Sequence, residues 1–281
     1  MTKNLYMEKI GEKAKIASLN LSNLSIDKRN SVLKQFSHYL KTNEQSILNA
    51  NKKDIFNAKS KKIKDSMIDR LKLNSKKIIQ IRSAIKKIVK FRDPVGKTLS
   101  SWKRPNGLII KRVSIPIGII GIIYESRPNV TSDVSALCFK SGNVVILRGG
   151  SEAFHSNKIL ATLFKRALKK KKCDENCVQF VESKDRHHVD YLLSRMKNYI
   201  DLIIPRGGKG LVKKVLKKSS VSIIGHYEGL CHVFVDRDAD LSTAIKVVKN
   251  SKMRNFSICG AAETLLIDKM CLKTHCKPIL D

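Results

Sequence analysis

Two kinds of segment in this sequence could carry chemistry: a cysteine among small residues and two glycine-rich turns. Cys259 is followed by one glycine and two alanines, and Lys252 and Arg254 lie close to it in the sequence. Small neighbours let a substrate approach a thiol, and nearby cations stabilise the thiolate, which is the nucleophilic form. A buried, inert cysteine is the competing interpretation of the same pattern.

The two glycine-rich turns are Arg148-Gly149-Gly150-Ser151 and Arg206-Gly207-Gly208-Lys209-Gly210. Backbone N–H groups and the helix dipole converge where a helix begins, so turns of this kind can bind phosphate groups. Neither turn matches the dinucleotide fingerprint GxGxxG or the P-loop, and an ordinary tight turn remains an alternative for each. Each turn begins with an arginine that can bind phosphate through two hydrogen bonds, and the pair therefore favours a nucleotide ligand.

The elements that would position these turns alternate between strands and helices. Residues 5–92 have helical spacing of apolar residues, with Ser25 and Ser75 as candidate N-caps, and the Pro-Asn-Gly turn within 99–113 predicts a hairpin. Apolar runs predict strands at 117–124, 143–147, 178–181, 200–205, 221–224, 232–235 and 264–267, most of them separated by helices. The pattern predicts an α/β fold with a doubly wound parallel sheet and a helical N-terminal layer.

The composition excludes several classes of protein. No apolar run approaches the roughly 18 residues of a membrane span and no secretory leader is visible, so we expect a cytoplasmic protein without a membrane partner. The seven cysteines have no zinc-site spacing, and we expect no metal. The 56 Lys and Arg against 24 Asp and Glu give a net charge of +32, which leaves a nucleic-acid or polyanion binder as an alternative. The lysines are scattered with few aromatic residues among them, which favours a solvated surface over a specific nucleic-acid site.

Five segments in order resemble the motifs of one enzyme family, gamma-glutamyl phosphate reductase of the aldehyde dehydrogenase superfamily: 113–131, 136–153, 201–208, 225–236 and 252–266. The resemblance implies an aldehyde-dehydrogenase-like fold. Residues 1–96 and 114–236 would form the NADP-binding domain and residues 97–113 an oligomerisation hairpin. Residues 237–281 would begin a second α/β domain, the catalytic domain.

The same resemblance implies NADPH-dependent reduction of gamma-glutamyl phosphate to glutamate 5-semialdehyde, with release of phosphate, in proline biosynthesis. Cys259 would be the nucleophile that forms a thioester, and the Asn129 side chain with the backbone N–H of Cys259 would stabilise the oxyanion. Arg254 would meet the phosphate of the substrate, although a structural arginine fits the pattern equally well. A homo-oligomer of the full-length protein and channelling with glutamate 5-kinase are the implied partnerships.

The cofactor expected from the resemblance is NADPH/NADP. Its binding residues would lie in the two glycine-rich turns: Arg148 and Ser151 at the 2′-phosphate, Glu152 at the ribose, and Arg206, Gly207 and Gly208 along the pyrophosphate. Members of the family continue well past the position that corresponds to Asp281, so we expect an incomplete catalytic domain. A truncated, inactive fragment is therefore the alternative to an active enzyme, and we expect weak cofactor binding and little turnover from this chain.

Overall fold

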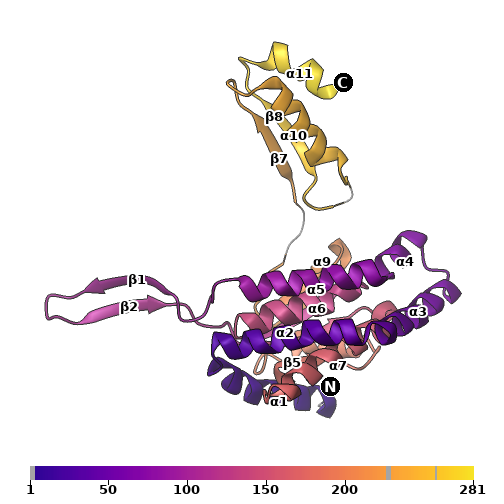
Figure 1. Cartoon of the computed structure of the whole chain (residues 1–281), viewed down its shortest axis with the longest axis vertical. Coiled ribbons are helices and arrows are strands. Elements are labelled where there is room, and N and C mark those ends of the chain that lie inside the picture. Colours follow the sequence, from indigo (N-terminus) through magenta and orange to yellow (C-terminus); the bar gives the residue numbers. More distant parts are fainter. Residues whose placement is uncertain (1–3, 226–228, 257) are drawn as a thin grey trace. The chain divides into compact units, whose positions relative to one another are not determined.

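The structure is a computed structural model that describes residues 4–225, 229–256 and 258–281. Contacts divide the chain into two compact units, Met1–Gly225 and His226–Asp281 (Figure 1). The sequence analysis placed the boundary of the cofactor-binding domain after residue 236. The division falls earlier because the strand at 231–235 pairs with a strand of the second unit.

A four-stranded parallel sheet forms the centre of the first unit. Its strand order is β5-β4-β3-β6, and its strands are β3 (Ile119–Tyr124), β4 (Val144–Gly149), β5 (Val178–Phe180) and β6 (Leu202–Arg206). Every residue of β3 and β4 is buried, as the continuous apolar runs predict for strands covered on both faces. Because β4 and β5 lie on one side of β3 and β6 on the other, the sheet has a topological switch point between β3 and β6, where α/β proteins bind ligands.

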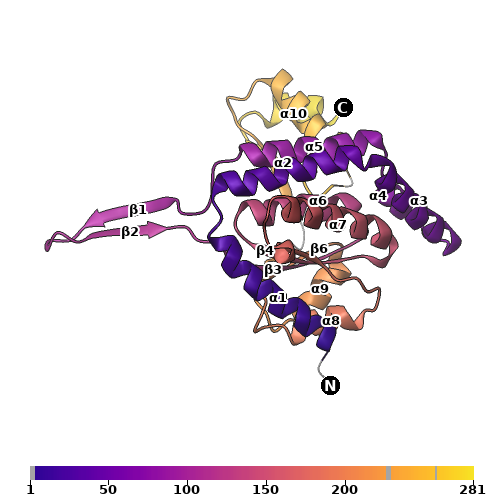
Figure 2. The ribbon, with the colours of Figure 1, turned by 60° about the horizontal axis from the view of Figure 1, so that its bottom comes forward.

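Helices cover both faces of this sheet (Figure 2). The layer formed by α6 and α7 packs on one face and is itself covered by α2 and α5, while α1, α8 and α9 lie on the opposite face. The N-terminal helices therefore do not form a single layer. The helices of this unit are α1 (Leu5–Ser22), α2 (Ile26–Thr42), α3 (Glu44–Ser60), α4 (Asp65–Leu71), α5 (Ser75–Lys90), α6 (Pro128–Lys140), α7 (Phe154–Lys170), α8 (His187–Ser194) and α9 (Lys209–Lys218).

Local chemistry explains two differences from the sequence-based expectations. Ser25 caps α2 as predicted, but the cap of α5 is Asn74 and not Ser75, because the Asn74 side chain accepts a hydrogen bond from the backbone N–H of Lys77 at 2.8 Å. Residues 221–224 contribute a single bridge, between Ile223 and Ile203, where a full strand was expected. That segment lies next to β6 at the edge of the sheet, and a short edge strand exposes few unpaired backbone groups.

Two buried polar side chains of α3 fix two connecting segments of the first unit. Asn51 donates to the carbonyl of Leu71 and accepts from the N–H of Leu73, both at 2.8 Å. The carboxylate of Asp54 accepts from the first N–H groups of α7, at His155 and Ser156. Because buried polar groups require partners, these contacts hold both the connection between α4 and α5 and the turn before α7 in one conformation.

A two-stranded antiparallel hairpin, β1 (Thr98–Lys103) and β2 (Ile109–Val113), confirms the predicted turn (Figure 1). Nearly all of its residues are exposed, including the large apolar side chains of Leu99, Trp102 and Ile109. An isolated two-stranded hairpin is marginally stable, and an exposed apolar edge of this kind is a template for pairing with another chain.

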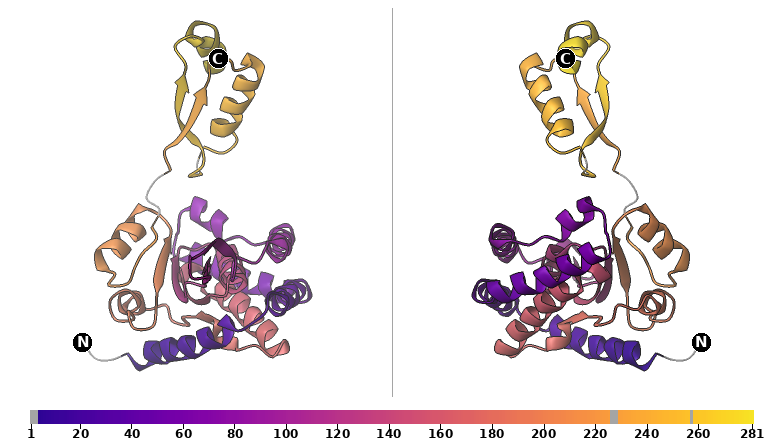
Figure 3. Two further views of the ribbon diagram at one scale, coloured as in Figure 1. Left: turned by 90° about the vertical axis from the view of Figure 1, so that its left-hand side faces the viewer. Right: turned by 90° about the vertical axis from the view of Figure 1, so that its right-hand side faces the viewer.

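The second unit contains the parallel pair β7 (Cys231–Val235) and β8 (Ala262–Ile267), with helices α10 (Leu241–Met253) and α11 (Leu272–Leu280) (Figure 3). Its small core consists of Val235, Ala244 and Cys271, with partly buried neighbours around them. Phe234, Val247 and Leu266 remain about half exposed. A strand, a crossover helix and a parallel strand form the βαβ arrangement that the alternating pattern predicts.

Candidate active site

The carboxyl ends of β3 and β6 meet at the switch point of the first unit. There the N–H of Gly208, which precedes α9, donates to the Oε1 of Glu125 at 2.7 Å, and the N–H of Glu125 donates to the carbonyl of Arg206 at 3.1 Å. A Cβ atom on Gly207 would lie 2.7 Å from the side chain of Glu125, so the turn needs a glycine for this close approach. A carboxylate oxygen bound to the N–H of Gly208 at the start of α9 indicates that this turn can accept an anionic oxygen.

The second glycine-rich turn lies at the end of β4, next to β3. Ser126, which follows β3, and Ser151 donate to the two carboxylate oxygens of Glu152 at 2.5 and 2.8 Å. Burial alone would raise the pKa of Glu152, but these hydrogen bonds and the positive charge of Lys61 outweigh burial and lower it. Glu152 is therefore ionised at neutral pH and presents acceptors, which suit the hydroxyl groups of a ribose.

Arg148 is used differently from the prediction that it meets a phosphate. Its guanidinium is buried and donates to the backbone carbonyls of Gly149, Lys184 and Asp185. Burial lowers its pKa, and its Nε has no partner among the described residues. The phosphate role of Arg148 stays a prediction, and it requires the loop at Lys184–Asp185 to release the guanidinium.

The two turns fit a dinucleotide. They follow β4 and β6, the two strands that flank β3, at the carboxyl edge of the sheet. A Cβ atom on Gly150 would lie close to the side chain of Ser126, and a Cβ atom on Gly207 close to that of Glu125. The N–H of Gly208 would receive pyrophosphate only if Glu125 gave way, because the two anions need the same donor. Sequence reasoning missed Glu125, although its position directly after the buried strand and before the Ser-Arg-Pro turn was a usable indication.

Asn129 occupies the first turn of α6, after Pro128, at the same edge of the sheet. Its side chain is exposed, and its Nδ2 donates to the Oδ2 of Asp133 at 3.2 Å. The amide has a second N–H, which gives it a donor for an oxyanion in addition to the bond with Asp133. The structure thus places Asn129 near the strand ends that carry the two glycine-rich turns.

Cys259 belongs to the second unit, in the loop between α10 and β8. A Cβ atom on Gly229 would lie 2.3 Å from the backbone carbonyl of Cys259, so glycine at 229 lets this loop pack against the segment that precedes β7. The thiol of Cys231 also donates to that carbonyl, at 3.5 Å, whereas a Cβ on Gly260 would meet open space. The backbone at Cys259 is thus packed tightly against Gly229, whereas the neighbouring Gly260 faces open space.

The two cations near Cys259 in the sequence have different surroundings. The ammonium of Lys252 forms an ion pair with Glu263 at 3.2 Å, which gives Glu263 a structural partner. Arg254 caps the end of α10 and is exposed to solvent. Arg254 therefore remains the cation available for a ligand of this loop, as the sequence analysis expected for the phosphate of the substrate.

Cys259 differs from the other cysteines in its accessibility. Among the seven, all of which lie in the described residues, it alone is exposed. Burial raises the pKa of Cys138 to about 12 and also raises the pKa of Cys177. The structure therefore supports a reactive thiol at Cys259 over the buried, inert cysteine that the pattern left as an alternative.

This contrast leads to a prediction about thiol reactivity. At neutral pH, a small alkylating reagent in limiting amount should modify Cys259 first, because exposed thiols react while buried thiols with raised pKa values do not. Peptide mass spectrometry over a time course measures the order of labelling. The variant Cys259→Ser should lose the fast phase and Cys276→Ser should keep it; fast labelling of Cys138 or Cys177 would contradict the prediction.

The residues predicted from the sequence fall into two sets. The first unit brings the Ser151–Glu152 turn, the Arg206–Gly208 turn and Asn129 to the carboxyl edge of its sheet, and the second unit carries Cys259 and Arg254. No group of three or more His, Cys, Asp or Glu side chains within the described residues could hold a metal ion. In the same residues, no helix combines the length and apolar character needed to cross a bilayer.

Comparison with known proteins adds a consistent set of similarities. The profile of the aldehyde dehydrogenase family matches residues 3–279. The gamma-glutamyl phosphate reductase of Paramagnetospirillum magneticum is 43% identical over 274 residues, which cover 98% of this chain and 64% of that protein. The crystal structure of the reductase from Thermotoga maritima is similar with a TM-score of 0.90 and 39% identity, over 98% of this chain and 66% of that one. The Saccharomyces cerevisiae structure of the same name gives a TM-score of 0.73 at 31% identity, over 97% and 67%.

Proposed function

We propose a function from the premise that the chain belongs to the aldehyde dehydrogenase family, within which the relatives it matches are gamma-glutamyl phosphate reductases. The proposal is that this protein is an oxidoreductase that reduces gamma-glutamyl phosphate to glutamate 5-semialdehyde with release of phosphate, a step of proline biosynthesis. The chain spans about 64% of the length of the curated relative from P. magneticum. The single observation that carries the proposal is the exposed Cys259 in a loop flanked by small residues.

The reaction assigns one step to Cys259. Its thiolate would attack the acyl carbon of gamma-glutamyl phosphate, forming a C–S bond, and the C–O bond to the phosphate would break, leaving a thioester and free phosphate. Asn129 and the backbone N–H of Cys259 would donate to the oxyanion of the tetrahedral intermediate. Arg254 would bind the leaving phosphate, since it is an exposed cation close to Cys259 in the sequence.

The proposed cofactor is NADPH, which supplies the hydride for reduction of the thioester when bound. The turn Arg206–Gly208 would hold its pyrophosphate, with Glu125 moving off the N–H of Gly208. Glu152 would hold the ribose on the adenine side and Ser151 would bind its 2′-phosphate, with Arg148 joining Ser151 once the 184–185 loop releases it. This assignment rests on the contacts of the two glycine-rich turns within the first unit.

The direct test is the reverse reaction, followed as absorbance of the reduced cofactor with glutamate 5-semialdehyde, phosphate and NADP. A second readout is the mass of Cys259 after incubation with acetyl phosphate, which reports acylation without the cofactor. Turnover that requires phosphate, or a mass increase confined to Cys259, supports the proposal. The absence of both turnover and acylation at Cys259 would contradict the proposal.

The charge of Glu152 gives a prediction about cofactor preference. An ionised carboxylate at the ribose repels a 2′-phosphate, so Glu152→Gln should raise the ratio of NADPH affinity to NADH affinity by about tenfold, or roughly 1.4 kcal/mol. Fluorescence titration with each reduced cofactor measures the ratio. Glu182→Gln, which changes an exposed ion pair with Lys158 elsewhere, serves as the control. An unchanged or lower ratio in Glu152→Gln would exclude Glu152 from the ribose site.

We also propose that the hairpin of β1 and β2 is covered by a second copy in the full-length protein. Its apolar side chains, including Leu99, Trp102 and Ile109, are exposed on a pair of strands that contacts little else. Burying such an edge removes apolar area and unpaired backbone groups from water. Channelling with glutamate 5-kinase stays a prediction of the resemblance, with no residues assigned to it.

A further inference from the structure

A cavity of about 330 Å³ in the first unit lies apart from the glycine-rich turns and has not been assigned a role. Its walls come from α4, the connection between α4 and α5, α5 itself and the first turns of α6. The polar side chains in these walls are Arg70, Lys72, Lys77, Gln80, Asn129 and Asp133. The cavity thus contains Asn129, the residue proposed to stabilise the oxyanion, together with three cations and one carboxylate.

The cations differ in how far they are already engaged. Lys72 forms an ion pair with Asp69 at 2.7 Å, and the ammonium of Lys77 donates to the backbone carbonyl of Lys72 at 2.6 Å. Within the described part of the chain, Arg70 has no hydrogen bond or ion pair, so its guanidinium is the group free to bind an anion. A guanidinium can form two parallel hydrogen bonds with a carboxylate, which makes Arg70 a suitable partner for one.

The opposite wall carries the carboxylate of Asp133. Asn129 and Asp133 are four residues apart on α6, which places both side chains on one face of the helix. Asp133 is half-buried and accepts one hydrogen bond from Asn129 at 3.2 Å. Burial raises the pKa of its carboxyl group. A partly desolvated carboxylate gains stability from a positively charged partner, and an ammonium ion in the cavity would supply it.

One wall of the cavity has a fixed backbone. Leu73 and Ile81 line it from buried positions in the core. The buried side chain of Asn51 bonds to the backbone of Leu71 and Leu73 and thereby fixes the segment that follows Arg70. A binding site whose backbone is held in place before a ligand arrives loses less entropy on binding, so this wall is suited to a specific small ligand.

We propose that this cavity recognises the amino-acid end of the substrate, an α-amino acid with a short side chain that carries the reacting acyl group. Arg70 binds the α-carboxylate, Asp133 accepts hydrogen bonds from the α-ammonium, and Lys77 adds positive charge beside the carboxylate. The methylene chain then leads the acyl group toward Asn129 at the cavity wall. This inference rests on the proposed function, because it takes Asn129 to be the oxyanion donor.

Ligand binding to the 281-residue chain tests the proposal. Titrations by ligand-observed NMR use L-glutamate, glutarate (which lacks the ammonium), 4-aminobutanoate (which lacks the α-carboxylate) and inorganic phosphate. Arg70→Gln should weaken L-glutamate binding by about tenfold or more and leave 4-aminobutanoate unchanged. Asp133→Asn should weaken L-glutamate and leave glutarate unchanged. Lys76→Gln, an exposed α5 lysine outside the cavity wall, is the matched control and should change none of these affinities.

Any one of three results would overturn the proposal. L-glutamate shows no saturable binding, Arg70→Gln lowers the affinities for L-glutamate and 4-aminobutanoate equally, or phosphate binds at Arg70 more tightly than L-glutamate does. The test is separable from that of the proposed function. If L-glutamate binds in an Arg70-dependent way but Cys259 is never acylated, the proposed ligand of the cavity is supported and the proposed reaction is contradicted. If Cys259 is acylated but L-glutamate does not bind, the proposed reaction is supported and the proposed role of the cavity is contradicted.

Discussion

Replacing Cys259 with serine in the full-length protein is expected to lower the rate of phosphate-dependent oxidation of glutamate 5-semialdehyde by at least about a thousandfold. A serine hydroxyl stays protonated at neutral pH, whereas a thiol is partly ionised and is the better nucleophile. The thioester would therefore not form, and both halves of the proposed reaction would stop. Absorbance of the reduced cofactor measures turnover, and the mass of the peptide that contains residue 259 measures acylation by acetyl phosphate.

The control for this experiment is Cys276→Ser, which changes a half-buried cysteine of α11 and should leave both readouts within about twofold of wild type. Comparing these two variants separates loss of the nucleophile from a general effect of removing a thiol in the second unit. Turnover of the full-length Cys259→Ser variant within tenfold of the full-length parent would exclude Cys259 as the nucleophile.

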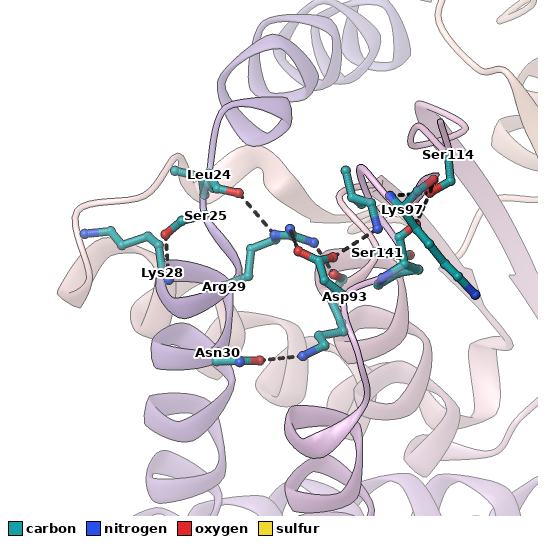
Figure 4. A network of polar contacts seen from close by, with 12 residues as sticks. Leu24, Ser25, Lys28, Arg29, Asn30, Asp93, Lys97, Ser114 and Ser141 are labelled. Carbon is teal, nitrogen blue, oxygen red and sulfur yellow. Dashed lines mark hydrogen bonds and ion pairs between the residues drawn. The ribbon is translucent and has the colours of Figure 1, made fainter. Parts of the chain in front are cut away.

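Replacing Arg29 with methionine is expected to lower the free energy of unfolding of the first unit by about 3 kcal/mol or more. The Arg29 side chain is 3% exposed, pairs with Asp93 at 2.7 Å, and donates to the carbonyls of Leu24 and Lys140 (Figure 4). Methionine fills much of the same space but leaves a carboxylate and two carbonyls without their donor. The loss of hydrogen bonds, more than a loss of volume, is the expected cause.

Urea denaturation followed by circular dichroism measures this effect in the transition of the first unit. Lys72→Met is the control, since it removes an ion pair with Asp69 between two exposed side chains and should cost less than about 1 kcal/mol. Equal losses in the two variants would show that the buried network around Arg29 contributes no more than a surface pair. The network joins α2, α6 and the segment after α5, so its loss should also loosen the helices that line the cavity.

Much of the central sheet was predictable from local patterns. The run from Ile119 to Tyr124 is apolar, β-branched and free of polar alternation, which only a strand covered on both faces accommodates. The hairpin followed from a Pro-Asn-Gly turn between two extended runs. The strand expected at 221–224 reduced to a single bridge, because pairing at the edge of a sheet depends on neighbours that a local pattern does not describe.

The contacts of the candidate site were less predictable. Arg148 begins a glycine-rich turn, and its position in the sequence predicts a phosphate ligand. Its guanidinium is instead buried against the carbonyls of Lys184 and Asp185, which belong to a loop distant in the sequence. Glu125 bound to Gly208 likewise joins the ends of β3 and β6, which are neighbours only in the folded sheet. Spacing along the chain contains no information on such pairs.

Residue types and their order were enough to predict the α/β class, the two glycine-rich turns and, through the family resemblance, the candidate nucleophile Cys259, because each depends on groups that are neighbours along the chain. Folding was needed to bring Arg70 of α4 to the same cavity as Asp133 of α6. Folding also left Arg70 without a partner among the described residues, while Lys72 and Lys77 acquired theirs. The physical reason is that burial, desolvation and convergence of charge arise from distances in space. A local pattern specifies the element on which a side chain lies, and only the packing of elements specifies what that side chain faces.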